Sequence, residues 1–121
     1  MVMNELDPRE DPSNDEYLPG CGMVDSCSNI LIADQFYNVL IHNFDRHYNQ
    51  NKAPLGLHFH TTWLKNNPEF FDAFVYWVDE VLENYNDVYF VTMTQAIKWI
   101  QNPQTVSESK SFESWRDKCV V

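Results

Sequence analysis

The chain has 121 residues and a formal net charge of −10, from 18 acidic and 8 basic side chains, and 15% of its residues are aromatic. This length allows one domain at most, with room for a usable core. Nucleic acids and anionic membranes attract clustered Lys and Arg, so the charge argues against both as partners. The sequence contains no apolar run long enough to span a bilayer and no signal-peptide pattern at Met1. A neutral polysaccharide or a basic protein remains compatible with it.

Residues 1–29 are predicted to form an irregular acidic loop, because prolines, glycines and acidic residues leave no period of 2 or 3.6 there. Cys21 and Cys27 bracket a short Gly-containing stretch. We expect a disulfide between them, which would contribute about 2 kcal/mol in the chain-entropy model. Cys119 would then lack a partner within the chain. The alternative is three free thiols in a cytosolic protein. A metal site built from the cysteines is disfavoured, because they form no Cys-x-x-Cys pair.

Residues 30–103 are predicted to form β/α units. The first helix covers residues 33 to about 49, with apolar residues at intervals of three and four. A strand follows over residues 53–60, in which apolar residues alternate with Gly56, His58 and His60. Since an N-cap Asn and a Pro at the first helical position come soon after, His60 lies at the C-terminal end of a strand. In β/α barrels that end of the strands carries the chemistry.

A second helix is predicted from Pro68, with Asn67 as its N-cap, to about residue 85. Its apolar stripe is Phe70, Phe71, Phe74, Val78, Val81 and Leu82. Residues 88–92 are predicted as a short buried strand, and residues 94–101 as a last helix whose inward side chains are Ala96, Ile97 and Ile100. Residues 104–121 are predicted as a polar tail, held down if Trp115 and Cys119 have partners. The order helix, strand, helix, strand, helix predicts parallel pairing.

His58 and His60 lie on one face of the predicted strand, about 7 Å apart. This spacing suits a His-x-His metal pair or an acid/base group with a neighbour. A zinc site requires a third protein ligand, and His42 and His47 point in different directions from a helix. The residues alone leave open that both are hydrogen-bonded structural histidines.

The stretches 43–48, 53–60 and 87–92 resemble the C-terminal part of the catalytic domain of arthropod chitin deacetylases. These belong to the polysaccharide deacetylase (NodB-like, carbohydrate esterase four) family. The likeness extends to both ends through residues 21–27 and 115–119. It implies an α/β fold class, the C-terminal fragment of a distorted (β/α) barrel with parallel strands, so that 1–121 is a partial domain. It also implies that Met1 lies inside the family's domain, with the rest of the deacetylase upstream, and that the protein is secreted.

The resemblance implies roles for three residues near the predicted strand end. In this family a metal-bound water hydrolyses the amide of an N-acetylglucosamine unit, and a strand-end His protonates the leaving amine. His60 matches that motif, and an amine leaves poorly unless a proton arrives as the C–N bond breaks. His58 stands where the family often has a leucine or another residue that lines the acetyl pocket. His58 and Trp63 are predicted to contact substrate, with packing as the alternative for Trp63.

The family's metal-binding motifs, an Asp-Asp pair after a strand and a His-x-x-x-His pair, match nothing in this sequence. We therefore expect zinc or another divalent metal in the full-length domain and none bound by this chain alone. The function predicted is part of a metal-dependent chitin deacetylase, inactive as this fragment, that acts on chitin or chitin oligomers. The alternative is a non-catalytic secreted protein of the cuticle or extracellular matrix that retains part of the barrel and binds chitin or another matrix partner. The isolated chain is expected to be marginally folded, because two strands leave exposed sheet edges.

Overall fold

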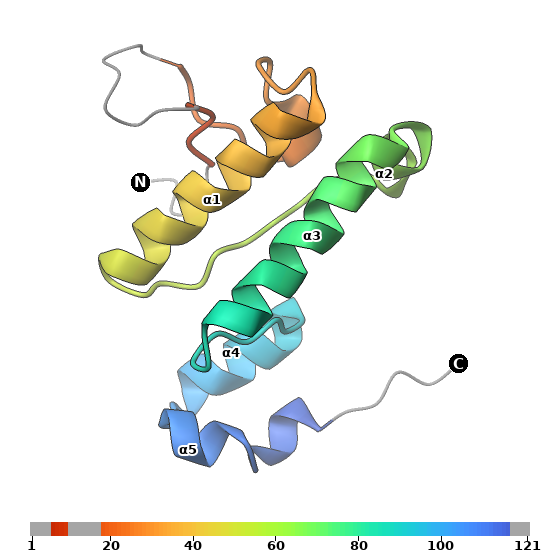
Figure 1. Ribbon diagram of the computed structural model, residues 1–121. Helices are drawn as coiled ribbons and strands as arrows, with labels where there is room; N and C mark the ends of the chain where they lie inside the picture. The colour runs from red at the N-terminus through yellow and green to blue at the C-terminus, as the bar shows by residue number, and fades with distance from the viewer. Residues whose placement is uncertain (1–5, 10–17, 117–121) are drawn as a thin grey trace. The chain divides into compact units, whose positions relative to one another are not determined.

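The computed structural model describes residues 6–9 and 18–116 of the chain (Figure 1). Its elements in chain order are a 3₁₀ turn η1 (Val24–Ser26), α1 (Ala33–Asn49), α2 (Thr61–Asn66), α3 (Pro68–Asn84), α4 (Met93–Gln101), α5 (Val106–Ser109) and a 3₁₀ turn η2 (Glu113–Trp115). The chain divides into two compact units between Glu83 and Asn84. No helix in the described ranges is both long and apolar enough to cross a membrane.

The predicted parallel strands are absent from the described residues, so the assignment to an α/β barrel fragment is wrong. Residues 53–60 and 88–92 are neither helix nor strand. An isolated antiparallel bridge joins Leu6 and Cys21, and the described ranges contain no other β pairing. A strand needs a second strand to take its backbone hydrogen bonds. The alternating pattern of residues 53–60 favours a strand but does not supply that partner.

The helix α1 has the bounds that its sequence pattern predicts. Its buried residues recur at intervals of three and four: Phe36, Val39, Leu40, Asn43 and Phe44. The side-chain oxygen of Gln35 accepts the N–H of Ile32 at 3.2 Å and closes the first turn. Beyond the helix the chain reverses at Lys52, whose φ is 54° and whose N–H donates to the carbonyl of His47 at 2.8 Å. A non-glycine residue in this region marks a tight local constraint, and here it directs residues 53–60 back along α1.

The helices α1 and α3 lie side by side and run in the same direction, and residues 50–60 carry the chain back between them (Figure 1). Aromatic pairs form their interface: Phe36 with Phe70, Tyr37 with Tyr76, and Phe44 with Trp77, at ring-centroid distances of 5.9, 5.7 and 6.2 Å. Such pairs contribute about 0.5–1.5 kcal/mol each beyond the area they bury. This aromatic seam is the core of the first unit.

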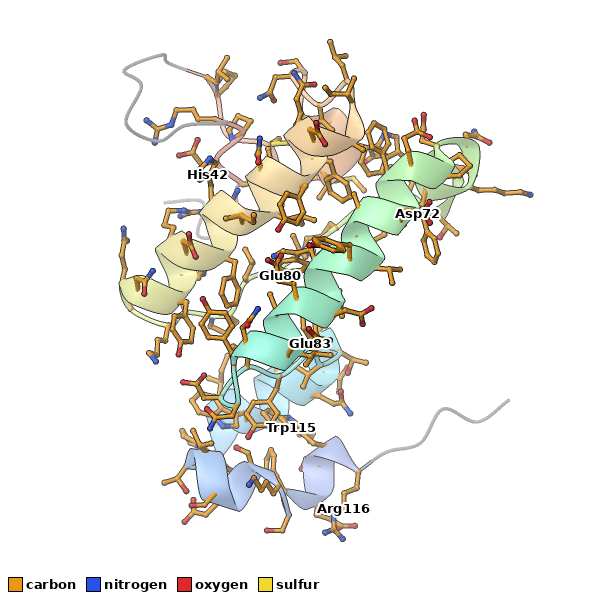
Figure 2. All side chains as sticks on the ribbon, viewed as in Figure 1. His42, Asp72, Glu80, Glu83, Trp115 and Arg116 are labelled. Atoms are coloured by element: carbon orange, nitrogen blue, oxygen red, sulfur yellow. A yellow bond between two sulfur atoms is a disulfide. The ribbon has the colours of Figure 1, made fainter. Side chains whose placement is uncertain are left out.

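A polar contact accompanies the aromatic seam. Glu80 lies on α3 (Figure 2) and accepts a hydrogen bond from the hydroxyl of Tyr37 on α1. Because the carboxylate accepts the phenolic proton, it raises the pKa of Tyr37 to about 12. The contact joins the N-terminal part of α1 to α3.

The predicted apolar stripe of α3 is only partly buried. Phe70 and Val81 are buried, whereas Phe71 and Leu82 are 51% and 52% exposed. The sequence of α3 contains two adjacent apolar stripes, and the helix α1 covers the one that includes Phe70, Trp77 and Val81. Periodicity alone does not say which of two neighbouring stripes is covered.

The segment between His60 and Pro68 contains the short helix α2 (Thr61–Asn66). Asn67, predicted as the N-cap of α3, uses its side-chain amide to donate to the carbonyl of Trp63 at 2.7 Å. Its backbone carbonyl accepts the N–H of Phe70 at 2.9 Å and so begins α3. Asn67 therefore bonds to α2 through its side chain and to α3 through its backbone.

In the second unit the helices α4 and α5 begin with reciprocal caps. The hydroxyl of Thr92 accepts the N–H of Gln95 at 3.2 Å, and the Gln95 side chain accepts the N–H of Thr92 at 2.9 Å. Thr105 and Glu108 repeat this arrangement at 3.2 and 3.0 Å. Each cap satisfies backbone N–H groups that a helix start leaves without partners.

Within the described part of the predicted polar tail, Trp115 contacts α4. The indole N–H of Trp115 donates to the carbonyl of Gln95 at 2.9 Å. Cys119 lies outside the described residues. Two side chains predicted to face inward from α4, Ile97 and Ile100, are instead 54% and 58% exposed. The predicted core of this unit is therefore wrong at these positions.

Candidate functional site

His60 lies where residues 53–60 end and α2 begins, as the N-cap residue of that helix. Two contacts fix the residues just before it. The ring of Phe59 packs against Phe74 of α3 with 5.5 Å between centroids, and the carbonyl of His58 accepts the N–H of Val24 at 2.8 Å. The backbone that carries His60 is thus tied to a helix on one side and to a loop on the other.

That loop is closed by a disulfide between Cys21 and Cys27, whose Cα atoms are 5.3 Å apart. The turn η1 lies inside it, and Val24 in this turn is fully buried, at 0% exposure. The N–H of Cys27 donates to the carbonyl of Val24 at 3.2 Å. Cys21 also exchanges two backbone hydrogen bonds with Leu6, at 2.9 and 3.1 Å. Covalent and hydrogen bonds therefore hold both ends of the loop.

A buried amide fastens the neighbouring residues 6–9 to α1. Asn43, with 0% exposure, accepts the N–H of Asp7 through Oδ1 and donates to the Asp7 carbonyl through Nδ2, both at 2.9 Å. Nε of Arg9 donates to the Asp7 carboxylate at 2.9 Å, and this bond lowers the pKa of Asp7. The disulfide loop, which bridges to Leu6, is thereby anchored on the first helix.

Asp25 reaches His60 from inside the closed loop. Its Oδ2 lies 2.6 Å from Nδ1 of His60, and the two side chains are 14% and 66% exposed, respectively. A carboxylate only accepts hydrogen bonds, so Nδ1 of the imidazole carries the proton. The other ring nitrogen, Nε2, is then the atom that exchanges a proton outside the pair. An Asp–His pair of this kind fixes the tautomer and the orientation of the ring.

The second oxygen of Asp25, Oδ1, is buried and has no hydrogen-bond partner within the described ranges. An unsatisfied buried acceptor costs about 1–3 kcal/mol, so buried polar atoms of this kind call for a functional or structural reason. No network of donors from the described residues orients this carboxylate. Its position depends on the backbone turn that carries it and on His60.

His58 and Trp63, the predicted substrate contacts, have different surroundings. The Trp63 ring stacks on Phe70 with centroids 4.6 Å apart and planes at 19°, and it meets Phe36 edge-on at 5.2 Å. Part of the indole is therefore engaged in the aromatic core. His58 is half-buried. Substrate contact by either residue stays a prediction.

The described residues do not form a metal centre. No group of three or more His, Cys, Asp or Glu side chains in residues 6–9 and 18–116 lies close enough together to hold an ion. His60 and Asp25 supply two donors, whereas a zinc site takes at least three protein ligands. The donor set of this pair suits proton transfer, with the imidazole as the group that gives or takes the proton.

The sequence pattern predicts a role for His60 but does not identify Asp25 as its partner. The two residues are 35 positions apart, and no periodicity connects a loop residue to the end of a distant extended segment. One signal was present: Asp25 is the acidic residue between two cysteines that were expected to pair. A short cross-linked loop presents its few side chains in a fixed direction, so an acid inside it is a candidate partner for a nearby base.

Two proteins of Bombyx mori resemble this chain. Chitin deacetylase 1 is 76% identical over 121 residues, which are 100% of the chain and 22% of that protein. Chitin deacetylase 8 is 35% identical over 86 residues, which are 69% of the chain and 22% of that protein. The chain belongs to the chitin deacetylase family. It spans about a fifth of the length of these two chitin deacetylases, and no family model matches it. The resemblance stated from the sequence is confirmed.

Proposed function

We propose that this chain is the part of a chitin deacetylase that delivers a proton to the leaving amine, through His60. The overall reaction joins water to the acetamide of an N-acetylglucosamine unit and yields a free amine and acetate. The observation that carries the proposal is the 2.6 Å contact between Nδ1 of His60 and Oδ2 of Asp25. It holds a largely exposed imidazole by one nitrogen and leaves the other for the substrate.

In this proposal each member of the pair has a distinct task. In the imidazolium form, Nε2–H of His60 donates to the amide nitrogen as the C–N bond breaks, and the nitrogen departs as a neutral amine. Asp25 accepts the Nδ1–H throughout, so it stabilises the positive ring before transfer and retains the productive tautomer after it. Proton delivery of this kind accelerates reactions by roughly 10²–10⁴-fold.

The proposed reaction needs further catalytic groups besides this pair. We infer that the rest of a full-length deacetylase supplies the base and the ligands of a zinc or other divalent ion, which polarises the carbonyl and activates water when it is bound. The support is the donor set described above, which holds one acid and its partner. By itself the chain is expected to release no acetate from chitin or chitin oligomers.

We also infer that the protein is secreted. The support is the disulfide between Cys21 and Cys27, because such bonds persist in oxidising compartments and are rare in the cytosol. Chitin as a partner agrees with the net charge of −10, which disfavours polyanions.

The test uses a full-length context, in which this chain replaces the 121 matching residues of the Bombyx mori chitin deacetylase 1. Acetate release from a chitin oligomer is measured for this graft, for His60→Gln, and for the matched control His42→Gln on α1. We expect His60→Gln to lower kcat by about 100-fold or more and the control to retain it. A folded graft that binds the oligomer without releasing acetate would favour the non-catalytic alternative. Equal rates for the graft and His60→Gln would show that His60 is not the acid.

A further inference from the structure

The turn that carries Asp25 lies wholly within the disulfide loop. Asp25 is the middle residue of η1 (Val24–Ser26), and the half-cystines at positions 21 and 27 stand on either side of that turn. Any movement of this turn moves the carboxylate relative to His60, which belongs to a different segment of the chain.

Few contacts hold this turn against the segment that ends at His60. The Val24 side chain is buried, and its N–H donates to the carbonyl of His58 at 2.8 Å. The hydroxyl of Ser26 donates to the carbonyl of Met23 at 2.7 Å, within the loop itself. One backbone hydrogen bond therefore joins η1 directly to the residues before His60. The disulfide restricts how far the rest of the loop can turn about that bond.

The imidazole has little packing of its own to keep it in place. The His60 side chain is 66% exposed, and its Nδ1 lies 2.6 Å from Oδ2 of Asp25. Asp25 in turn has no other donor on its buried Oδ1 within the described residues. Orientation of the ring thus depends on the carboxylate, and orientation of the carboxylate depends on the turn.

We propose that the disulfide between Cys21 and Cys27 is a positioning element for His60, which it aligns by holding the Asp25 turn. This rests on the proposed role of His60 as the acid. A chain in which the disulfide is open keeps its aromatic core but allows Asp25 to leave the ring. The deacetylase then turns over more slowly, while substrate affinity, which depends on other groups, changes little.

The first experiment opens the bond in the graft by adding dithiothreitol. Two thiol–disulfide exchanges pass two electrons and two protons to the Sγ atoms of Cys21 and Cys27, and the dithiol closes to its own cyclic disulfide. The rest of the graft can contain other disulfides, so a second protein, the double variant Cys21→Ala/Cys27→Ala, removes this bond alone. Val81→Ala on α3 is the matched control, because it removes a buried apolar group of the same unit away from the loop.

Two readouts separate positioning from general stability. The Nδ1 proton of His60, held in a short bond to a carboxylate, should give a downfield proton resonance in ¹⁵N-histidine-labelled protein, assigned by its loss in His60→Gln. In the double variant we expect this resonance to disappear and kcat to fall roughly 10-fold, the scale for loss of a group that orients a catalytic residue. The KM of the double variant should stay within about twofold of the parental KM, because the groups that bind the substrate are unchanged. Val81→Ala should keep both the resonance and kcat.

Three results would overturn the proposal. The first is a double variant with the parental resonance and kcat. The second is an oxidised parent without the resonance. The third is a double variant that unfolds by near-ultraviolet circular dichroism, because the disulfide would then stabilise the whole unit rather than the turn. Failure of the proposed function is distinguishable: His60→Gln would keep its activity while the resonance still depended on the disulfide.

Discussion

In the described residues the first unit has a buried apolar core, although large side chains such as Phe71 and Leu82 stay exposed, whereas the second unit exposes most of its large apolar side chains. Apart from Phe112, the buried apolar residues of the described ranges all precede Asn84. In the second unit seven large apolar residues are 36–58% exposed: Tyr89, Phe90, Val91, Met93, Ile97, Ile100 and Val106. Both units contain amphipathic helices. An apolar stripe therefore shows that a helix has a face to bury, and a neighbouring element decides whether that face is covered.

The contacts inside each unit are also of different kinds. In the first, α1 and α3 share an aromatic seam, and a disulfide and a buried Asn43 fasten the adjacent loop. In the second, the described contacts include reciprocal caps, the bond from Trp115 to α4, and ring contacts of Trp115 with Tyr89 and Phe112, but no disulfide. The Asp25–His60 pair belongs to the first unit. A site that must hold a side chain in one orientation is found where packing and covalent bonds restrict the backbone.

The largest effect that would test this contrast is on the free energy of local unfolding of α1. Phe36 is fully buried and contacts both Trp63 and Phe70. We expect Phe36→Ala to lower the opening free energy of α1 amides by about 3–5 kcal/mol, measured by hydrogen exchange in the graft. Phe90→Ala, at a residue 44% exposed in the second unit, should change it by less than about 0.5 kcal/mol. Similar effects from both would mean that the two units do not differ in packing.

The next effect concerns catalysis. Asp25→Asn keeps the volume of the side chain but removes its charge, so the imidazolium of His60 loses its stabilising partner. We expect kcat for acetate release to fall roughly 10- to 100-fold. The control is Glu113→Gln in the second unit, an acidic side chain that is 89% exposed and 3.8 Å from Arg116, which should leave kcat unchanged. A parental rate for Asp25→Asn would show that the pair does not contribute to turnover.

The sequence predicted those parts of the structure whose hydrogen bonds are local. The periodicity of residues 33–49 and the Pro at position 68 gave the starts of α1 and α3 correctly, because helical bonds join residues four apart. The sequence predicted wrongly those features that depend on residues far apart in the chain. The alternation in residues 53–60 gave a strand, but no described strand pairs with it, and the exposed Leu82 was placed in the core. Of the Asp25–His60 pair only His60 was found, through its family resemblance.

A smaller effect would test the second unit. The hydroxyl of Thr105 accepts the N–H of Glu108 at 3.2 Å and starts the four-residue helix α5. Loss of such a cap costs about 1 kcal/mol. We therefore expect Thr105→Ala to increase the exchange rate of amides in α5 and to leave those of α1 unchanged, while Thr105→Ser retains the parental rates. An equal change in α1 would mean that stability is shared between the units.

The smallest effect is the pH dependence of the Tyr37–Glu80 contact in the first unit. The folded pKa of Tyr37 is raised from 10.0 to about 12, chiefly because its hydroxyl donates to Glu80. Between these two values the folded chain keeps a proton that the unfolded chain has lost, so stability falls as pH rises. The contribution is fully present below pH 10 and is lost as pH passes through the folded value. Tyr37→Phe removes it. The difference in urea midpoint between parent and variant, measured by pulse proteolysis of the graft, should therefore shrink between these pH values. A difference that stays constant over that range would show that this contact does not couple α1 to α3.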